Sequence, residues 1–234
     1  MNWSSGDLFV LPAVKGGVEH RCNSADSSGE SDLSAVLYWI SDAPLLSYLG
    51  VAPAIARIDP TVFRRSRLMN EVTRIRHEEG SEHRNRMGIL LASARTRDTK
   101  TLTHTLWALL NVLPAGDAQP PHRHNSVALD LAVAATGGGA VYTLMSPVLD
   151  DDGRMVNPVK ADWVPGAAFM TPPGWWHSHV NESEEDAWVL PMQDAGLYTR
   201  QRTLDIRFAP RKGAVEIEGA KAGDRAKAAH ALAM

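Results

Sequence analysis

The chain has 234 residues, a formal net charge of −3 and a single cysteine, Cys22. This length suffices for one large β domain or two small ones, and the charge gives no broad basic surface for nucleic acid. One cysteine cannot form a disulfide within the chain, and no apolar run reaches the ~18 residues of a membrane helix. The first residues also lack the basic and apolar regions of a signal peptide. We therefore expect a cytoplasmic protein without nucleic-acid or membrane partners.

The first 55 residues combine short predicted strands with a long loop. Residues 6–12, GDLFVLP, predict a strand, and residues 13–34 have the glycine and serine content of a loop. Residues 34–40, SAVLYWI, form a continuous β-branched and aromatic run, which predicts a buried strand.

The next segment changes to a helical period. Asp59 is suited to cap a helix, Pro60 to its first position and Gly80 to its end. The apolar residues that recur at helical spacing are Val62, Phe63, Leu68, Met69, Val72 and Ile75. Residues 56–86 are therefore expected to form a helical connector between two β units.

Residues 87–210 predict many short strands separated by turn residues, a pattern typical of a sandwich or barrel. Residues 211–234 are rich in alanine, lysine and glycine and have little apolar pattern. We expect a mobile tail there.

The chain also resembles itself. WSSGDLFVLP, which begins at Trp3, and WVPGAAFMTP, which begins at Trp163, have the same spacing from tryptophan to glycine, phenylalanine and proline. Each copy continues to a histidine, His20 in the first and His179 in the second. We infer duplicated β units, of which residues 1–55 correspond only to the second half of a barrel. Because an open half-barrel exposes strand edges, we expect its residues to pack on the complete barrel or on another subunit.

The segment PPHRHNSVALDLAV, residues 120–133, carries two histidines one residue apart. Residues i and i+2 of a strand point to the same side, so His122 and His124 direct both imidazoles to one place. A third metal ligand must come from a neighbouring strand, and His177 in PPGWWHSHVN is the best candidate. Taken alone, the HRH segment is better explained as a pair of exposed strand histidines.

Two motifs make the metal interpretation specific, G-x5-H-x-H and G-x5-P-x-G-x2-H-x3-N. Their fixed positions are Gly116, His122 and His124, and then Gly166, Pro172, Gly174, His177 and Asn181. These motifs resemble those of the cupins, over residues 104–208 and again in part over 1–50. The resemblance implies an all-β fold, the double-stranded β-helix or jelly roll. We expect one complete barrel at 87–210, a partial second cupin unit and a connecting helix.

One position departs from the cupin pattern. Ala128 stands four residues after the second histidine, where cupins commonly have a glutamate ligand. A site of three histidines is therefore expected, with Fe(II) favoured and Mn, Ni, Zn or Cu as alternatives.

Within the cupins, the stretches TLWALLNVLPAGDAQPPHRHNSVALDL and TPPGWWHSHVNES resemble the bicupin gentisate and salicylate 1,2-dioxygenases. The resemblance implies Fe(II) held by His122, His124 and His177. It also implies a substrate that chelates the iron through a carboxylate and a hydroxyl, with O2 beside it. His179 falls at a position that contacts substrate or oxygen.

The same resemblance implies substrate-binding roles for Trp107 and Asn111, and for Arg86 near an arginine that anchors the carboxylate. Asp130 stands where the family has another arginine, which pairs with the substrate carboxylate. Asp130 either forms a structural ion pair or caps a turn, or it selects a substrate that has an amine or a hydroxyl. We count Asp130 with His179 as candidate catalytic residues.

We therefore predict a non-haem iron, ring-cleaving dioxygenase that acts with O2 on a hydroxylated or aminated aromatic acid, as a homodimer or homotetramer. Two alternatives stay open. One is a metal-dependent isomerase, lyase or hydrolase, and the other is a non-catalytic ligand-binding cupin. The incomplete amino-terminal unit favours the latter, and the sequence does not decide whether the chain is naturally shortened.

Overall fold

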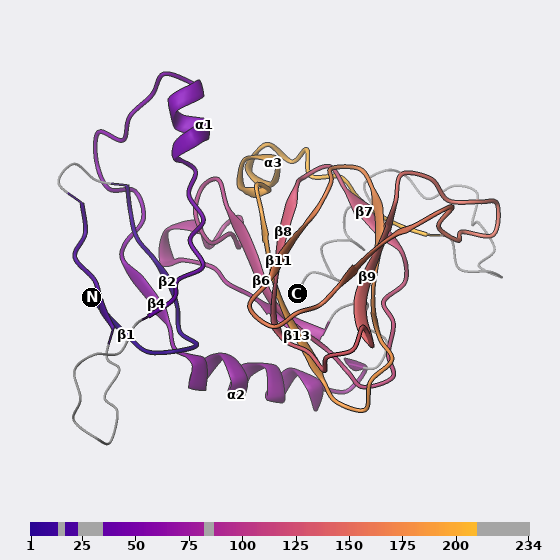
Figure 1. Ribbon diagram of the computed structural model, residues 1–234. Helices are drawn as coiled ribbons and strands as arrows, with labels where there is room; N and C mark the ends of the chain where they lie inside the picture. Colours follow the sequence, from indigo (N-terminus) through magenta and orange to yellow (C-terminus); the bar gives the residue numbers. More distant parts are fainter. Residues whose placement is uncertain (14–16, 23–34, 82–86, 210–234) are drawn as a thin grey trace, which may run out of the picture.

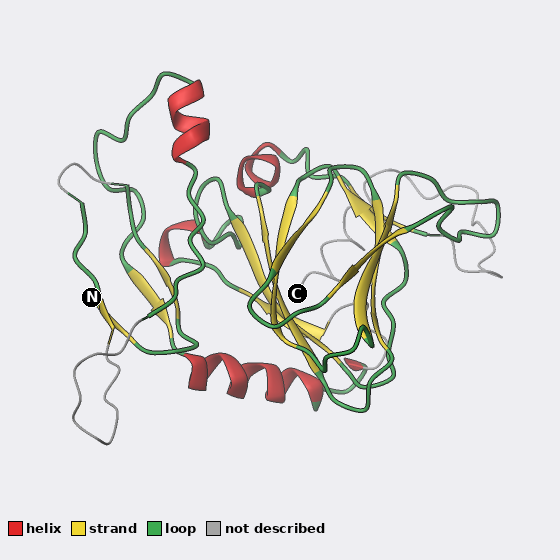
Figure 2. Cartoon of the chain, in the orientation of Figure 1, coloured by secondary structure: helices red, strands yellow, loops and turns green. Residues whose placement is uncertain are grey.

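The computed structural model describes residues 1–13, 17–22, 35–81 and 87–209 (Figure 1). The expected tail at 211–234 and the candidate Arg86 lie outside these described residues. Strands dominate the part of the chain that forms the barrel, and the longest described helix runs along one side of it (Figure 2).

The barrel consists of two antiparallel sheets of five strands each. One sheet has the order β10-β9-β12-β7-β14, and the other has the order β11-β8-β13-β6-β5. The strands are β5 Met87–Leu90, β6 Trp107–Leu113, β7 His122–His124, β8 Ala128–Ala134, β9 Val141–Ser146, β10 Val159–Asp162, β11 Ala168–Thr171, β12 Trp176–Asn181, β13 Ala187–Gln193 and β14 Ile206–Phe208. A short 3-10 helix at Ala94–Thr96 and helix α3 at Gly196–Gln201 lie in the connections. Most strand neighbours are distant in sequence, as in a double-sheet jelly roll, so the all-β jelly-roll prediction is confirmed.

Strand β6 is buried on both faces, which explains its nearly continuous apolar sequence, WALLNVL. Leu113 faces the inside of the barrel, where it packs with Trp163 and Val189. Leu110, on the opposite face, packs against the amino-terminal part of the chain. Strand β8 instead alternates buried and exposed residues over much of its length, as expected for a strand with one covered face.

The amino-terminal residues cover the outer side of β6. Strand β2 Leu8–Val10 pairs with β4 Thr61–Phe63, and helix α2 Arg65–Arg76 packs Leu68 and Val72 into the same cluster as the outward side chains of β6. The remaining amino-terminal elements are β1 Asn2–Trp3, which pairs in parallel with β3 Arg21–Cys22, and helix α1 Ala43–Tyr48. Part of the amino-terminal region thus covers one sheet of the barrel.

Two local predictions are wrong. Residues 35–40 form no strand, and they are largely exposed, with 96% of Val36 and 60% of Trp39 accessible to solvent. A β-branched and aromatic composition describes a good fit to a pleated surface, and no strand of the described chain pairs with this segment. The helix predicted from Asp59 starts at Arg65 instead, because the intervening residues pair with β2.

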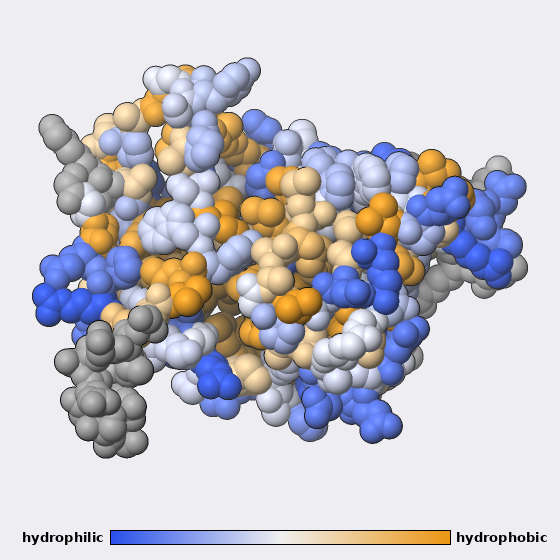
Figure 3. Space-filling model, in the orientation of Figure 1, coloured by the Kyte–Doolittle hydropathy of each residue, from blue (hydrophilic) through white to orange (hydrophobic). Residues whose placement is uncertain are grey.

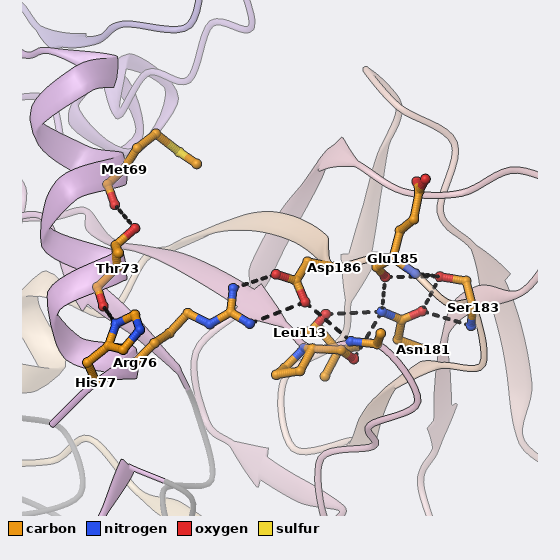
Figure 4. Close-up of polar contacts among 11 residues, drawn as sticks. Met69, Thr73, Arg76, His77, Leu113, Asn181, Ser183, Glu185 and Asp186 are labelled. Atoms are coloured by element: carbon orange, nitrogen blue, oxygen red, sulfur yellow. Dashed lines mark hydrogen bonds and ion pairs between the residues drawn. The ribbon is translucent and has the colours of Figure 1, made fainter. Parts of the chain in front are cut away.

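Polar contacts attach α2 to the end of the barrel (Figure 4). Arg76 on α2 donates hydrogen bonds to the carboxylate of Asp186, which lies just before β13. Nearby, the side-chain amide of Asn181 donates to the carbonyl oxygens of Leu113 and Glu185, at 3.0 and 2.8 Å. The asparagine of the second motif therefore ties the end of β12 to the end of β6.

Hydrophobic side chains are exposed on the outer face of β8 and β11, at Leu129, Val133 and Met170. Residues 36–55 expose a further set. Figure 3 shows hydrophobic surface across the middle of the molecule, around the place where β8 and β11 lie in Figure 1. Among the described helices, none combines the length and the apolar composition needed to cross a bilayer.

Gly88 tests the close pairing of β5 with β6. A Cβ added at Gly88 would lie 2.4 Å from the backbone oxygen of Leu110, an atom that cannot move aside without distorting the strand. Gly88→Ala should therefore lower the free energy of unfolding, measured by urea titration, by about 1–3 kcal/mol. In the control Gly137→Ala, where the added Cβ meets nothing within 4 Å, the change should stay below about 0.5 kcal/mol. Equal stability of the two variants would contradict this packing.

Candidate functional site

Four buried histidines from two neighbouring strands meet inside the barrel. His122 and His124 come from β7, His177 and His179 come from β12, and each is at most 3% exposed. His122 is the direct cross-strand partner of His177, so the antiparallel pairing itself brings the two rings together. The alternation along each strand adds the second histidine on the same side.

The ring centroids give the spacing of this cluster. His177 lies 4.0 Å from His122 and 4.9 Å from His124, whereas His122 and His124 are 6.4 Å apart. His179 is farther out, 5.8 Å from His177 and 6.3 Å from His122. The structure therefore brings together all three residues predicted as metal ligands, with His177 in the centre and His179 alongside.

Backbone carbonyls orient the three predicted ligands in the same way. Nδ1 of His122 lies 3.2 Å from the carbonyl oxygen of Pro120, and Nδ1 of His177 lies 3.2 Å from that of Trp175. Nδ1 of His124 lies 2.8 Å from the carbonyl oxygen of Ser126. A carbonyl oxygen only accepts hydrogen bonds, so each Nδ1 carries a proton, and in the neutral ring Nε2 then keeps its lone pair. This is the tautomer that binds a metal through Nε2.

The donor set fits a divalent metal in its chemistry, since three neutral imidazoles share one buried place. The histidines are spaced more widely than in a formed metal site, where each ligand nitrogen lies within ~2.1 Å of the metal. In the described part of the chain, no group of three or more His, Cys, Asp or Glu side chains is placed to hold a metal ion. Metal binding by these histidines therefore requires His122 and His124 to draw closer to a common point.

Strand β14 supports the histidines from the other side of β7. It pairs with all three residues of β7, and Phe208 lies opposite His122 with its ring stacked on the imidazole at 5.9 Å between centroids. Strand β12 pairs with β7 through His122 and His177, and backbone hydrogen bonds from Gly174 to the carbonyl of His124 and from Gln119 to that of His179 extend this contact.

The opposite sheet contributes side-chain amides to the inside of the barrel. Asn111 on β6 is 1% exposed, and among the described residues its Oδ1 has no hydrogen-bond partner. A buried acceptor in that state costs free energy unless a ligand or water donates to it. Trp107, the other predicted pocket residue of β6, is partly buried and pairs with Gln193 of β13.

Gln193 contacts His124, and this contact was not predicted from the sequence. Its Oε1 accepts a hydrogen bond from Ser126, and its Nε2 lies 3.5 Å from Nε2 of His124. The available signal was an amide in an otherwise apolar strand, at a position that alternation turns inward.

Asp130 is buried in the wall formed by β8, with 2% of its surface exposed, and accepts a hydrogen bond of 2.9 Å from the hydroxyl of Thr171. Burial, with a smaller contribution from the negative charge of Asp130, raises the pKa of Tyr38. Segment 35–40 therefore passes close enough to the barrel for Tyr38 to interact electrostatically with the carboxylate of Asp130. The sequence did not predict that proximity.

Comparisons with known proteins agree with this architecture. No protein-family model matches the chain. The chain is 31% identical over 109 residues to gentisate 1,2 dioxygenase 1 from Aquipseudomonas alcaligenes, and 29% identical over 123 residues to 5-aminosalicylate 1,2-dioxygenase from Comamonas sp. These matches cover 44% and 52% of this chain but 27% and 29% of the relatives. The matched part thus spans less than a third of each relative.

A solved structure of salicylate 1,2-dioxygenase from Pseudaminobacter salicylatoxidans superposes with a TM-score of 0.54. The match has 18% sequence identity and covers 74% of this chain and 48% of that one. At this identity the likeness concerns the fold. The chain therefore has a jelly-roll fold like that of salicylate 1,2-dioxygenase, and part of its sequence is similar to gentisate and 5-aminosalicylate 1,2-dioxygenases.

Proposed function

We propose that this chain is a ring-cleaving dioxygenase that uses Fe(II), held by His122, His124 and His177, and O2. The observation that carries the proposal is the common tautomer of these three buried residues, whose Nδ1 atoms all face backbone carbonyls. When bound, iron(II) would supply a Lewis acid that orients and polarises a chelating substrate and O2. Both oxygen atoms enter the product as a ring bond breaks, so no further reductant is needed.

The protein's own task is to hold the two reactants side by side in a site closed to water. The four histidines are nearly inaccessible to solvent, and an apolar cluster that includes Trp163 and Val189 fills the barrel beyond them. His179, next to the three proposed ligands, would donate a hydrogen bond or a proton to the substrate.

The polar groups of the opposite wall favour a substrate that brings hydrogen-bond donors. Asn111 presents a buried acceptor without a partner among the described residues, and Asp130 presents a carboxylate where the related dioxygenases have an arginine. We therefore propose a hydroxylated or aminated aromatic acid. One matched relative is named a 5-aminosalicylate dioxygenase, which supports an aminated ring. In this proposal Trp107 and Arg86 contribute to substrate binding.

A non-catalytic ligand-binding cupin is the second candidate. It is favoured by the wide separation of His122 and His124, at 6.4 Å between ring centroids, and by the finding that no described group is placed to hold a metal. The exposed hydrophobic face of β8 and β11 supports the expected homodimer or homotetramer. That expectation and a cytoplasmic location stay predictions, and light scattering would test the former.

Removal of one proposed ligand should abolish metal binding. We expect His122→Ala and His177→Ala to lose nearly all iron, measured by elemental analysis of protein purified without chelators, because two imidazoles bind a divalent metal far more weakly than three. His104→Ala is the matched control, since His104 is exposed and lies outside the cluster. Metal content that is the same in all four proteins would refute the proposed site.

Oxygen consumption tests the reaction class. Iron-loaded protein should take up O2, measured with an oxygen electrode, in the presence of at least one member of a panel of hydroxy- and aminobenzoates. The absorbance of the aromatic ring should fall in parallel. Turnover that proceeds equally without oxygen would instead indicate an isomerase, lyase or hydrolase. Ligand binding without any turnover would indicate the non-catalytic alternative.

Replacement of Asn111 should separate stability from binding. Asn111→Leu removes a buried acceptor that has no partner among the described residues, so the free energy of unfolding should rise by about 1 kcal/mol while the KM for the substrate increases. Asn181→Leu is the opposite case, because the Asn181 amide is fully engaged with backbone carbonyls, and it should lower stability. A less stable Asn111→Leu variant with unchanged KM would argue against a ligand contact at this residue.

A further inference from the structure

A short chain of hydrogen bonds leads from the barrel core to His179. The indole Nε1 of Trp163 donates to the hydroxyl of Thr143 at 2.8 Å, and that hydroxyl lies 2.8 Å from Nδ1 of His179. All three residues are at most 2% exposed. Thr143 is also the cross-strand partner of His179 in the pairing of β9 with β12, so the backbone holds this contact in place.

The direction of these hydrogen bonds follows from the number of donors. An indole nitrogen can only donate, so it occupies a lone pair of the Thr143 hydroxyl. That hydroxyl has one proton, and among the described residues the acceptor within its reach is Nδ1 of His179. If Nδ1 carried the proton instead, the hydroxyl proton would be buried without an acceptor. Thr143 therefore donates to His179, and the ring proton of His179 lies on Nε2.

The amino-terminal copy of the repeat supports the same assignment independently. Trp3 and His20 occupy the positions that match Trp163 and His179, and here the indole Nε1 donates directly to Nδ1 of His20 at 3.1 Å. In both copies the tryptophan also stacks on the matching phenylalanine with an angle of 28° between rings. Since an indole cannot accept, Nδ1 of His20 must accept and Nε2 must carry the proton.

The four histidines inside the barrel thus divide into two kinds. His122, His124 and His177 donate through Nδ1 to carbonyl oxygens and keep a lone pair on Nε2. His179 has the reverse arrangement. Such a ring is a poor metal ligand through Nε2 and a good hydrogen-bond donor through the same atom.

We propose that Thr143, supported by Trp163, is a positioning residue that fixes His179 as the Nε2–H tautomer. In this form His179 donates a hydrogen bond to an anionic oxygen of the substrate, a carboxylate or a phenolate. The role toward substrate rests on the proposed function, whereas the tautomer of His179 does not.

The tautomers can be read directly from the ring-nitrogen chemical shifts of the full chain labelled with 15N-histidine, at a pH of about 8 where free imidazoles are neutral. Loss of one set of signals in His179→Gln assigns the ring. We expect the Nε2–H form for His179 in the wild-type protein. An Nδ1–H form would overturn the proposal without any further variant.

Variants at position 143 test the cause. Thr143→Val keeps the shape of the side chain and removes the hydroxyl, so His179 should lose its preference and show both tautomers, whereas Thr143→Ser should retain the wild-type form. If Thr143→Val does not fold, Trp163→Phe serves instead. It frees a lone pair of the hydroxyl, so His179 can donate to it and both tautomers should appear. A single, unchanged tautomer in the folded variant would overturn the assignment to Thr143.

The role toward substrate has its own readout. With the substrate identified by oxygen uptake, Thr143→Val should lower kcat about tenfold or more at unchanged metal content, and Thr143→Ser should restore most of it. A changed tautomer with an unchanged kcat would refute the donor role of His179. If the wild-type chain consumes no oxygen with any substrate, the proposed function fails, while the tautomer measurement still decides the assignment to Thr143.

Discussion

The pairing of β7 with β12 is the constraint on which the rest of the site depends. Strand β7 is three residues long, and its cross-strand register sets His122 opposite His177. A shift of either strand by one residue would turn its histidines to the other face of the sheet and dissolve the cluster. Strand β14, which pairs with all three residues of β7, and the backbone hydrogen bonds from Gly174 to His124 and from Gln119 to His179 keep this register.

Much of this arrangement could be predicted because it rests on local spacing. The two-residue alternation along a strand already directs His122 and His124 together, and the second motif supplies His177. The jelly roll follows from the same motifs. Contacts that depend on which strands become neighbours could not be predicted in this way. The approach of Gln193 to His124 and the link from Trp163 through Thr143 to His179 both depend on such contacts.

The predictions that were wrong have a common physical origin. Residues 35–40 have the composition of a buried strand, yet in the described chain no strand edge pairs with them. Asp59 and Pro60 have the chemistry of a helix start, yet the residues that follow them pair with β2. In the first case no partner strand is present among the described residues, and in the second the pairing with β2 outweighs the local preference. Arg86 lies outside the described residues, so its predicted contact with the substrate carboxylate stays a prediction.

The position of β7 beside the edge strand β14 has a mechanical consequence. Three residue pairs join β7 to β14, an edge strand of its sheet, and one pair joins it to β12. Edge strands are peeled from a sheet most easily, because hydrogen bonds hold them on one side alone. Tension applied to the chain beyond Phe208 would thus be transmitted first to the strand that carries His122 and His124. The positions of His122 and His124 therefore depend on the attachment of an edge strand as well as on the pairing with β12.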